Sequence, residues 1–267
     1  MTTASAVTSS PHRWSIVLAL LIAGCLGLAG TGRTQTRQTL AIRGHQQSVY
    51  ISGPPRGDPV IVSSGDGGWI HLGPQVAEFL SARGFFVVGF DVKAYLESFT
   101  SRRATLGPEE EPGDYLILAE FARTTTGKKP ILIGVSEGAG LSVLAATDER
   151  TKTAIAGVIG LGLPDVNELA WRWKDVAIYL THRVPDEPTF SAAAIVDRVA
   201  PLPLAATHST HDEFVPLSDV RRVLNGARDP KRLWIVTASD HRFSDNLGEF
   251  DRILLDALAW VKEKSPR

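Results

Sequence analysis

Short apolar runs alternate with amphipathic stretches over most of the chain. The runs are rich in Val, Ile and Phe and are bounded by Gly, Pro or Asp, a pattern typical of strands buried inside a parallel sheet. The stretches between them repeat apolar side chains with helical spacing. The predicted strands span residues 47–52, 59–64, 84–91, 130–135, 155–161, 202–207 and 232–238, and the predicted helices span residues 74–83, 113–125, 138–147, 217–226 and 248–262. This alternation predicts an α/β domain with a doubly wound, mainly parallel sheet and helices on both faces.

Residues 164–200 interrupt the alternation after the sixth strand position of the sheet. Apolar side chains recur there at every second position from 168 to 173 and include Trp171 and Trp173. A period of two predicts an extra strand at 168–173, and residues 175–180 are also compatible with a strand. We therefore expect a short insertion beside the ends of the strands. Its two tryptophans either line a pocket for an acyl or lipid group or pack inside the fold.

An uncharged, mostly apolar segment at residues 14–30 follows a polar start that ends in Arg13. This order is typical of a signal peptide. Three outcomes remain open. Ile22-Ala-Gly-Cys25 resembles a lipobox, in which Cys25 is lipidated; Gly27-Leu-Ala29 offers an ordinary cleavage site; or the uncut segment anchors the chain, although it is slightly short for a full membrane span. Each outcome predicts a periplasmic or otherwise extracytoplasmic domain.

Residues 1–30 are accordingly assigned to this leader, residues 31–45 to a linker and residues 46–265 to the α/β domain. A chain of 267 residues suits one such domain. The net charge of -1 gives no basic stripe of the kind that binds nucleic acid. Cys25 is the single cysteine, which excludes a disulfide framework and a cysteine-based metal site.

The strand at 130–135 runs directly into Ser136, which is flanked as Gly134-Val-Ser136-Glu-Gly138. G-x-S-x-G between a strand and a helix is the nucleophile elbow of the α/β-hydrolase fold. A serine on so sharp a turn has strained backbone angles, and side chains at the flanking glycines would collide with neighbouring backbone. The turn also directs the N–H of Glu137 toward charge that develops beside the hydroxyl. The pattern predicts a nucleophile at Ser136; the alternative is an ordinary strand-to-helix turn.

A serine nucleophile needs a base and an acid that orients it, and this fold supplies them in the order Ser, acid, His. Asp212 follows a predicted strand and precedes Val-Pro, which favours it as the acid, with Glu213 as the alternative. His241 begins the loop after the last predicted strand and is the predicted base. Asp91 and Asp240 are weaker candidates for the acid.

His208 and His211 lie three positions apart beside Asp212 and are candidates for a pair of metal ligands. They fall in a loop rather than on one helix face, and no third ligand is evident in the sequence. The sequence therefore predicts neither a metal nor a cofactor.

The loop from Ser64 to Trp69 follows a predicted strand and is expected to complete an oxyanion hole with the N–H of Glu137. The N–H of Asp66 is the best-placed second donor, followed by that of Gly67; the alternative is a plain flexible turn. A carboxylate beside a developing anion is unfavourable, so we hypothesise that Asp66 turns its side chain away to bind a cation of the substrate. Trp69 joins the tryptophans of the insertion as a candidate substrate-binding residue.

Ser64-Gly-Asp-Gly-Gly-Trp69, directly after a strand, resembles the signature of the bacterial virulence proteins VirJ and AcvB, which are periplasmic α/β-hydrolase-like proteins. The resemblance covers roughly residues 59–262, including the elbow, the inserted strand and the acid and histidine loops. It implies hydrolysis of aminoacylated phosphatidylglycerol in the cell envelope and an association with type IV secretion. The family elbow is approximately Gly-Tyr-Ser-Phe-Gly-Ala-Asp, against Gly134-Val-Ser-Glu-Gly-Ala-Gly140 here, and its histidine loop is approximately Gly-Gly-His-His-Phe, against Ser239-Asp-His-Arg-Phe243.

Together these features predict an exported serine hydrolase that cleaves a small-molecule or lipid ester with a triad of Ser136, Asp212 and His241. Lysyl-phosphatidylglycerol is the substrate that the resemblance suggests, and the N-terminal segment offers a membrane attachment. Two other functions fit the same sequence. One is a non-catalytic, hydrolase-like envelope protein that binds a lipid or a secretion partner; the other is a peptidase or acyltransferase with the same triad.

Overall fold

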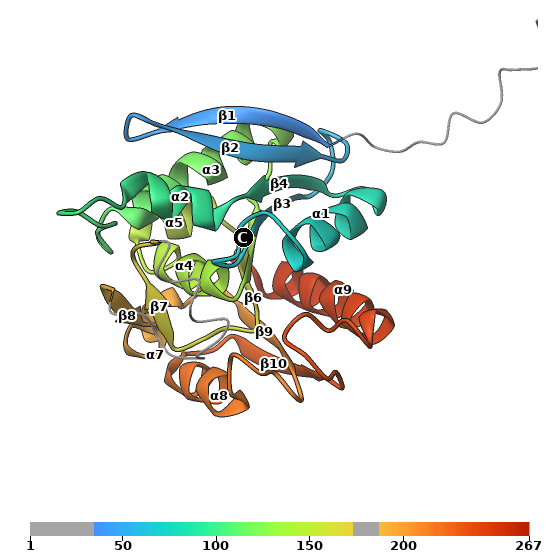
Figure 1. The fold of residues 1–267 in the computed structure, drawn as a ribbon. Helices are drawn as coiled ribbons and strands as arrows, with labels where there is room; N and C mark the ends of the chain where they lie inside the picture. The colour runs from blue at the N-terminus through green and yellow to red at the C-terminus, as the bar shows by residue number, and fades with distance from the viewer. Residues whose placement is uncertain (1–34, 173–186, 267) are drawn as a thin grey trace, which may run out of the picture. The chain divides into compact units, whose positions relative to one another are not determined.

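The computed structural model describes residues 35–172 and 187–266, and an eight-stranded sheet forms the centre of this part (Figure 1). The strands lie in the order β1-β2-β4-β3-β5-β6-β9-β10. From β4 to β10 they run parallel, whereas β2 is antiparallel to β4 and β1 is antiparallel to β2. The strands span Thr36–Ile42 (β1), His45–Ser52 (β2), Pro59–Ser63 (β3), Phe86–Phe90 (β4), Ile131–Val135 (β5), Gly157–Leu161 (β6), Leu204–Ser209 (β9) and Lys231–Val236 (β10). The predicted mainly parallel sheet is confirmed.

Helices cover both faces of the sheet, as predicted. Helices α1 and α9 pack with Val60 and Val62 of β3 on one face, and helices α2, α3, α4, α5, α7 and α8 pack with Ile61 on the other (Figure 1). The strands β3, β4, β5 and β6 are buried along their whole length, which explains why their sequences are continuously apolar. The helices span Leu72–Ala82 (α1), Val92–Phe99 (α2), Glu111–Thr126 (α3), Glu137–Ala145 (α4), Glu149–Ala154 (α5), Ala192–Ile195 (α7), Leu217–Gly226 (α8) and Leu247–Lys264 (α9), with a 3-10 helix at Val196–Val199 (η2).

The parallel strands bring four functional loops to one edge of the sheet. The register pairs Ser63 with Gly134 and Leu161 with Thr207, so that β3, β5, β6 and β9 end side by side. Open α/β sheets bind ligands at the carboxyl ends of their strands. The loops after β3, β5, β9 and β10 therefore surround a common space.

An edge strand occupies residues 36–42 of the linker that was predicted at residues 31–45. Strand β1 pairs with β2 over its whole length, and Arg37 donates hydrogen bonds to Ser48. Most of β1 is exposed to solvent. Its polar sequence resembles a linker because an edge strand on the surface needs no apolar face.

The insertion after β6 contains a separate two-stranded sheet, formed by β7 (Val166–Glu168) and β8 (Thr189–Ser191). The predicted strand at 168–173 is wrong, because β7 ends where that strand was expected to begin. Leu169, Ala170 and Trp171 are all buried, so the alternation does not separate a buried face from an exposed one. Their backbone bonds instead with loops: the Leu169 carbonyl accepts from Leu106, and the Trp171 N–H donates to the Thr100 hydroxyl.

Other predictions for this insertion and for the leader fall outside the part that the structure describes. They concern Trp173, the second strand at 175–180, and the leader with Cys25. Within residues 35–172 and 187–266, no helix combines the length and the apolar character needed to span a bilayer.

Candidate active site

Ser136 lies on a strained turn between β5 and α4. Its backbone has φ 50° and ψ -116°, a conformation that non-glycine residues rarely adopt. Such strain costs about 1–3 kcal/mol and persists only where the surroundings fix it. Here the N–H of Ser136 donates to the carbonyl of Leu161 at 2.8 Å, which ties the turn to the end of β6.

The two flanking glycines make this turn possible. A Cβ at Gly134 would lie 2.1 Å from the carbonyl oxygen of Gly138, and a Cβ at Gly138 would lie 2.3 Å from that of Ser64. Both distances are far inside van der Waals contact. The G-x-S-x-G spacing thus lets α4 start directly against β5 and the end of β3.

Asp212 and His241 come from the loops after β9 and β10 and contact each other directly. The distance from Asp212 Oδ2 to His241 Nδ1 is 2.6 Å. The other oxygen of Asp212 accepts the N–H groups of Phe214, at 3.0 Å, and Val215, at 2.8 Å. Burial alone would raise the pKa of Asp212, but the bonds from His241 and from the two N–H groups lower it below its ordinary value. Asp212 is therefore an ionised acceptor that fixes the Nδ1–H tautomer of His241.

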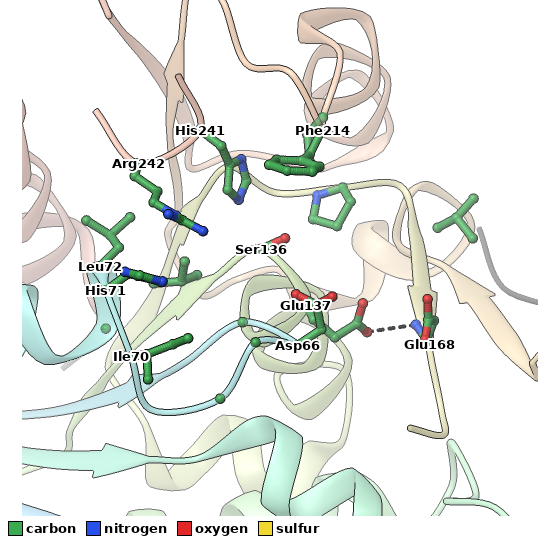
Figure 2. Close-up of a pocket in the computed structure, with 18 of the residues that line it drawn as sticks. Asp66, Ile70, His71, Leu72, Ser136, Glu137, Glu168, Phe214, His241 and Arg242 are labelled. Atoms are coloured by element: carbon green, nitrogen blue, oxygen red, sulfur yellow. Dashed lines mark hydrogen bonds between the residues drawn. The ribbon is translucent and has the colours of Figure 1, made fainter. Parts of the chain in front are cut away.

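The ring of His241 is held from two further sides. Phe214 packs edge-on at 5.7 Å between centroids. On the other side lies Gly162, with φ 62°, where a Cβ would be 2.5 Å from His241 Cε1. With Nδ1 bound to Asp212, the ring presents Nε2 to the pocket that Ser136 also lines. Figure 2 shows the ring directed toward the end of β5, where Ser136 lies.

The alternative acids make other contacts. Glu213 accepts the backbone N–H of His241 at 2.7 Å rather than contacting the ring. Asp240 accepts backbone N–H groups within its own loop, and Asp91 caps helix α2. Among these four carboxylates, Asp212 is the one bonded to the imidazole of His241.

The loop after β3 passes directly beside Ser136. A Cβ at Gly65 would lie 3.5 Å from Ser136 Cβ, and Asp66 and Gly67 line the same pocket as Ser136. Glu137 is the first residue of α4, so its N–H has no carbonyl one turn earlier to bond with. The structure thus brings the three residues predicted for the oxyanion hole together around Ser136.

The walls of the pocket differ in their ionisable groups. The carboxyl groups of Asp66, Glu137 and Glu168 lie to one side of Ser136, whereas the basic side chains of Arg242 and His71 lie to the other (Figure 2). Ile70 and Val166 belong to the same lining and expose apolar surface.

Sequence reasoning missed several of these wall residues. The sequence places Glu168 in a predicted strand without a role in the site, although its side chain is buried beside the pocket, and His71 belongs to no recognisable pattern. The place of Arg242 beside the site could have been predicted, because this residue directly follows the predicted base.

The tryptophans proposed for substrate binding lie elsewhere. Trp69 stacks on Tyr50 at 4.9 Å and fills the space above Gly89, where a Cβ would lie 2.2 Å from its ring. Trp171 is buried in the core, with the ammonium of Lys93 4.2 Å from its centroid. Neither ring lines the pocket, so both serve packing instead.

The side chains of His208 and His211 do not meet at a common metal site. His208 is fully buried in β9, whereas His211 is exposed in the following loop. The described residues contain no group of three or more His, Cys, Asp or Glu side chains arranged to hold a metal.

Comparison with known families identifies the fold. Residues 58–177, which include the loop after β3 and the elbow, match the family described as bacterial virulence protein (VirJ). Residues 58–177 are thus similar to VirJ, and the chain has the α/β-hydrolase fold. No curated protein matches it.

Solved structures share this fold at low sequence identity. The α/β hydrolase GrgF from Penicillium sp. sh18 superposes with a TM-score of 0.64 at 13% identity, over 87% of this chain and 99% of that one. The esterase domain of a Rhodothermus marinus protein gives 0.59 at 17% identity, over 86% and 98%. A membrane phospholipase A, described as a novel bacterial virulence factor, gives 0.60 at 10% identity, over 85% and 87%. At such identities the likeness shows the fold alone.

Proposed function

We propose that this VirJ-like protein is an exported serine hydrolase that cleaves an ester with Ser136, His241 and Asp212. The observation that carries the proposal is the 2.6 Å contact of Asp212 with His241 in the pocket where the strained turn presents Ser136. Export is supported by the apolar segment at residues 14–30.

The geometry supports a two-step acyl transfer to water. The Ser136 hydroxyl oxygen attacks the ester carbonyl while His241 Nε2 takes its proton, and ionised Asp212 stabilises the resulting imidazolium. The tetrahedral intermediate collapses, and His241 returns the proton to the leaving alcohol. Water then attacks the acyl-enzyme with the same histidine as base, which releases the acid and restores the Ser136 hydroxyl.

The negative oxygen of each intermediate needs donors that already point at it. The N–H of Glu137 is available at the start of α4, with a second N–H from Asp66 or Gly67. Removing one such donor typically lowers kcat by about 10²–10³-fold. The loop after β3 is thus expected to contribute to catalysis almost as strongly as the triad.

An aminoacylated phospholipid such as lysyl-phosphatidylglycerol is the substrate we favour. The likeness to VirJ supports it, and so does the distribution of charge in the pocket. An aminoacyl group carries a cation that suits the wall with Asp66, whereas a phosphate in the leaving group suits the wall with Arg242. The apolar surfaces of Ile70 and Val166 suit a lipid.

Reaction with a fluorophosphonate probe tests the proposal. Wild-type protein should be labelled at Ser136, and Ser136→Ala should not be labelled. Ser218→Ala, which removes an exposed hydroxyl on α8, is the matched control and should label like wild type. If folded wild-type protein is not labelled, the protein is a non-catalytic binder. A panel of lysyl- and alanyl-phosphatidylglycerol, simple esters and peptides then separates the proposed substrate from peptidase and acyltransferase activities.

A further inference from the structure

The side chain of Glu137 has no part in the mechanism above, although it adjoins the nucleophile. It is buried at the start of α4, and its Oε1 accepts the backbone N–H of Glu168 at 2.7 Å (Figure 2). This bond joins the nucleophile helix to strand β7, between residues 31 positions apart in the chain. The contact links the catalytic loops to the insertion.

The N–H of Glu168 needs this acceptor. In an antiparallel pair, successive N–H groups point alternately toward the partner strand and away from it. The N–H of Leu169 donates to Pro188 on the side of β8, so that of Glu168 points to the opposite side. Glu168 is buried, and a buried donor without an acceptor would cost about 1–3 kcal/mol. Glu137 supplies that acceptor.

A second contact docks β7 on the same helix. The side chain of Asn167 lies so close to Gly140 that a Cβ there would be 1.7 Å from its Oδ1. The Asn167 amide is itself fixed by the carbonyls of Pro164 and Asp165. A shape contact through Asn167 and a polar contact through Glu137 thus hold β7 against the first turns of α4.

The surroundings of Glu137 favour its neutral form. Burial is the largest cause, and the charges of Glu168 and Asp66 add to it, so that the pKa of Glu137 lies well above its ordinary value. The bond from the Glu168 N–H acts in the opposite direction but is outweighed. The groups that face this carboxyl are Asp66 from the loop after β3, Glu168 from β7 and Tyr115 from α3, and the pocket also contains His71, Asp219, His241 and Arg242.

We propose that Glu137 is a positioning residue that works in its neutral form, holding β7 against the nucleophile helix without placing a negative charge beside the oxyanion site. This inference rests on the proposed hydrolase function. The neutral form predominates below the pKa of Glu137 and disappears as the pH rises through it. Ionisation places a second charge next to the developing oxyanion, so kcat should decline on the alkaline side.

Two variants separate these roles. Glu137→Gln keeps an acceptor for the Glu168 N–H and cannot ionise, so its pH profile should lose the alkaline decline in kcat. Glu137→Ala removes the acceptor and also cannot ionise; its kcat should lie about tenfold below wild type at low pH, which corresponds to about 1.4 kcal/mol, and should show no alkaline decline. Glu149 is the matched control, because it is also the first residue of a helix but is exposed. Glu149→Gln and Glu149→Ala should leave the pH profile unchanged.

Amide hydrogen exchange supplies a readout that needs no catalysis. The Glu168 N–H should be protected in wild type and in Glu137→Gln and should exchange at least tenfold faster in Glu137→Ala. Equal protection in the alanine variant would overturn the positioning role, and an alkaline decline retained by the glutamine variant would overturn the role of the neutral form. If wild type cleaves no ester, the hydrolase proposal fails, while the exchange rates still decide whether Glu137 holds β7.

Discussion

The loops that carry the proposed triad and the insertion after β6 border the same pocket, but different forces hold them. Ser136 and Asp212 are fixed by backbone hydrogen bonds and by glycines that admit no side chain. The insertion forms a separate sheet of two three-residue strands, which docks on α4 through the side chains of Glu137 and Asn167. The loops belong to the main sheet, whereas strand β7 of the insertion docks on α4 through side chains.

On the proposed function, the loops of the triad carry out the chemistry, whereas the pocket walls select the substrate. Changes in the catalytic loops should abolish turnover of every ester, because the same proton transfers serve all of them. Changes in the pocket walls should alter which ester is preferred or at which pH it is cleaved. The predictions below test that separation, beginning with the largest expected effect.

Asp212→Asn should lower kcat by about 10⁴-fold on all esters, because an amide donor at this position favours the wrong tautomer of His241. The fold should survive, since the oxygen of asparagine can still accept the N–H groups of Phe214 and Val215. Steady-state kinetics on a neutral and a cationic ester, with circular dichroism as a check on folding, measure the effect.

Glu213→Gln is the matched control for that experiment. It changes the neighbouring carboxylate, which bonds to the backbone of His241 rather than to its ring, and the glutamine oxygen can still accept that N–H. We expect less than a threefold change in kcat. A loss comparable to that of Asp212→Asn would reassign the acid.

The contrast between the two regions also explains what could be predicted from the sequence. The alternation of strands and helices, the elbow and the loops of Asp212 and His241 follow from local patterns, because regular elements of a parallel sheet bring their ends together automatically. The order of the three loops was sufficient to predict that they share one edge. The contact between Asp212 and His241 is the outcome of that topology.

The surroundings of Trp171, Trp69 and the Glu137 side chain could not be predicted, because they depend on residues that are distant in the chain. The spacing of Trp171 indicated a strand, yet the segment is buried on all sides against residues near Leu106 and Thr100. Trp69 follows the functional loop directly but stacks on Tyr50, a residue of another strand. For Glu137, sequence reasoning identified the N–H and not the side chain, because its acceptor role depends on where β7 packs.

Gly138→Ala should destabilise the protein by about 1–3 kcal/mol, because its Cβ would collide with the carbonyl of Ser64. Gly113→Ala is the matched control, since a Cβ at this position of helix α3 would meet nothing within 4 Å. That substitution should stabilise the protein by about 0.5–1 kcal/mol through helix propensity. Urea unfolding of both variants measures the difference. Equal stability would show that the turn tolerates a side chain and that the spacing has no steric basis.

Asp66→Asn should produce the smallest effect and the one most specific to the pocket walls. The substitution removes the carboxylate but keeps the backbone N–H proposed for the oxyanion hole, so cleavage of a neutral ester should hardly change. For an ester with a cationic acyl group and the same leaving group, kcat/KM should fall about 2–5-fold, the size expected for one partly exposed charge pair. In wild type, added salt should reduce the difference in kcat/KM between the cationic and the neutral ester, because salt screens exposed charges.

Asp219→Asn, which changes another acid of the pocket lining, should have a smaller effect on kcat/KM, because Asp219 lies 3.4 Å from the guanidinium of Arg222. Equal losses on both esters would mean that Asp66 shapes the loop instead of recognising a cation, and the wall would then not select substrates by charge.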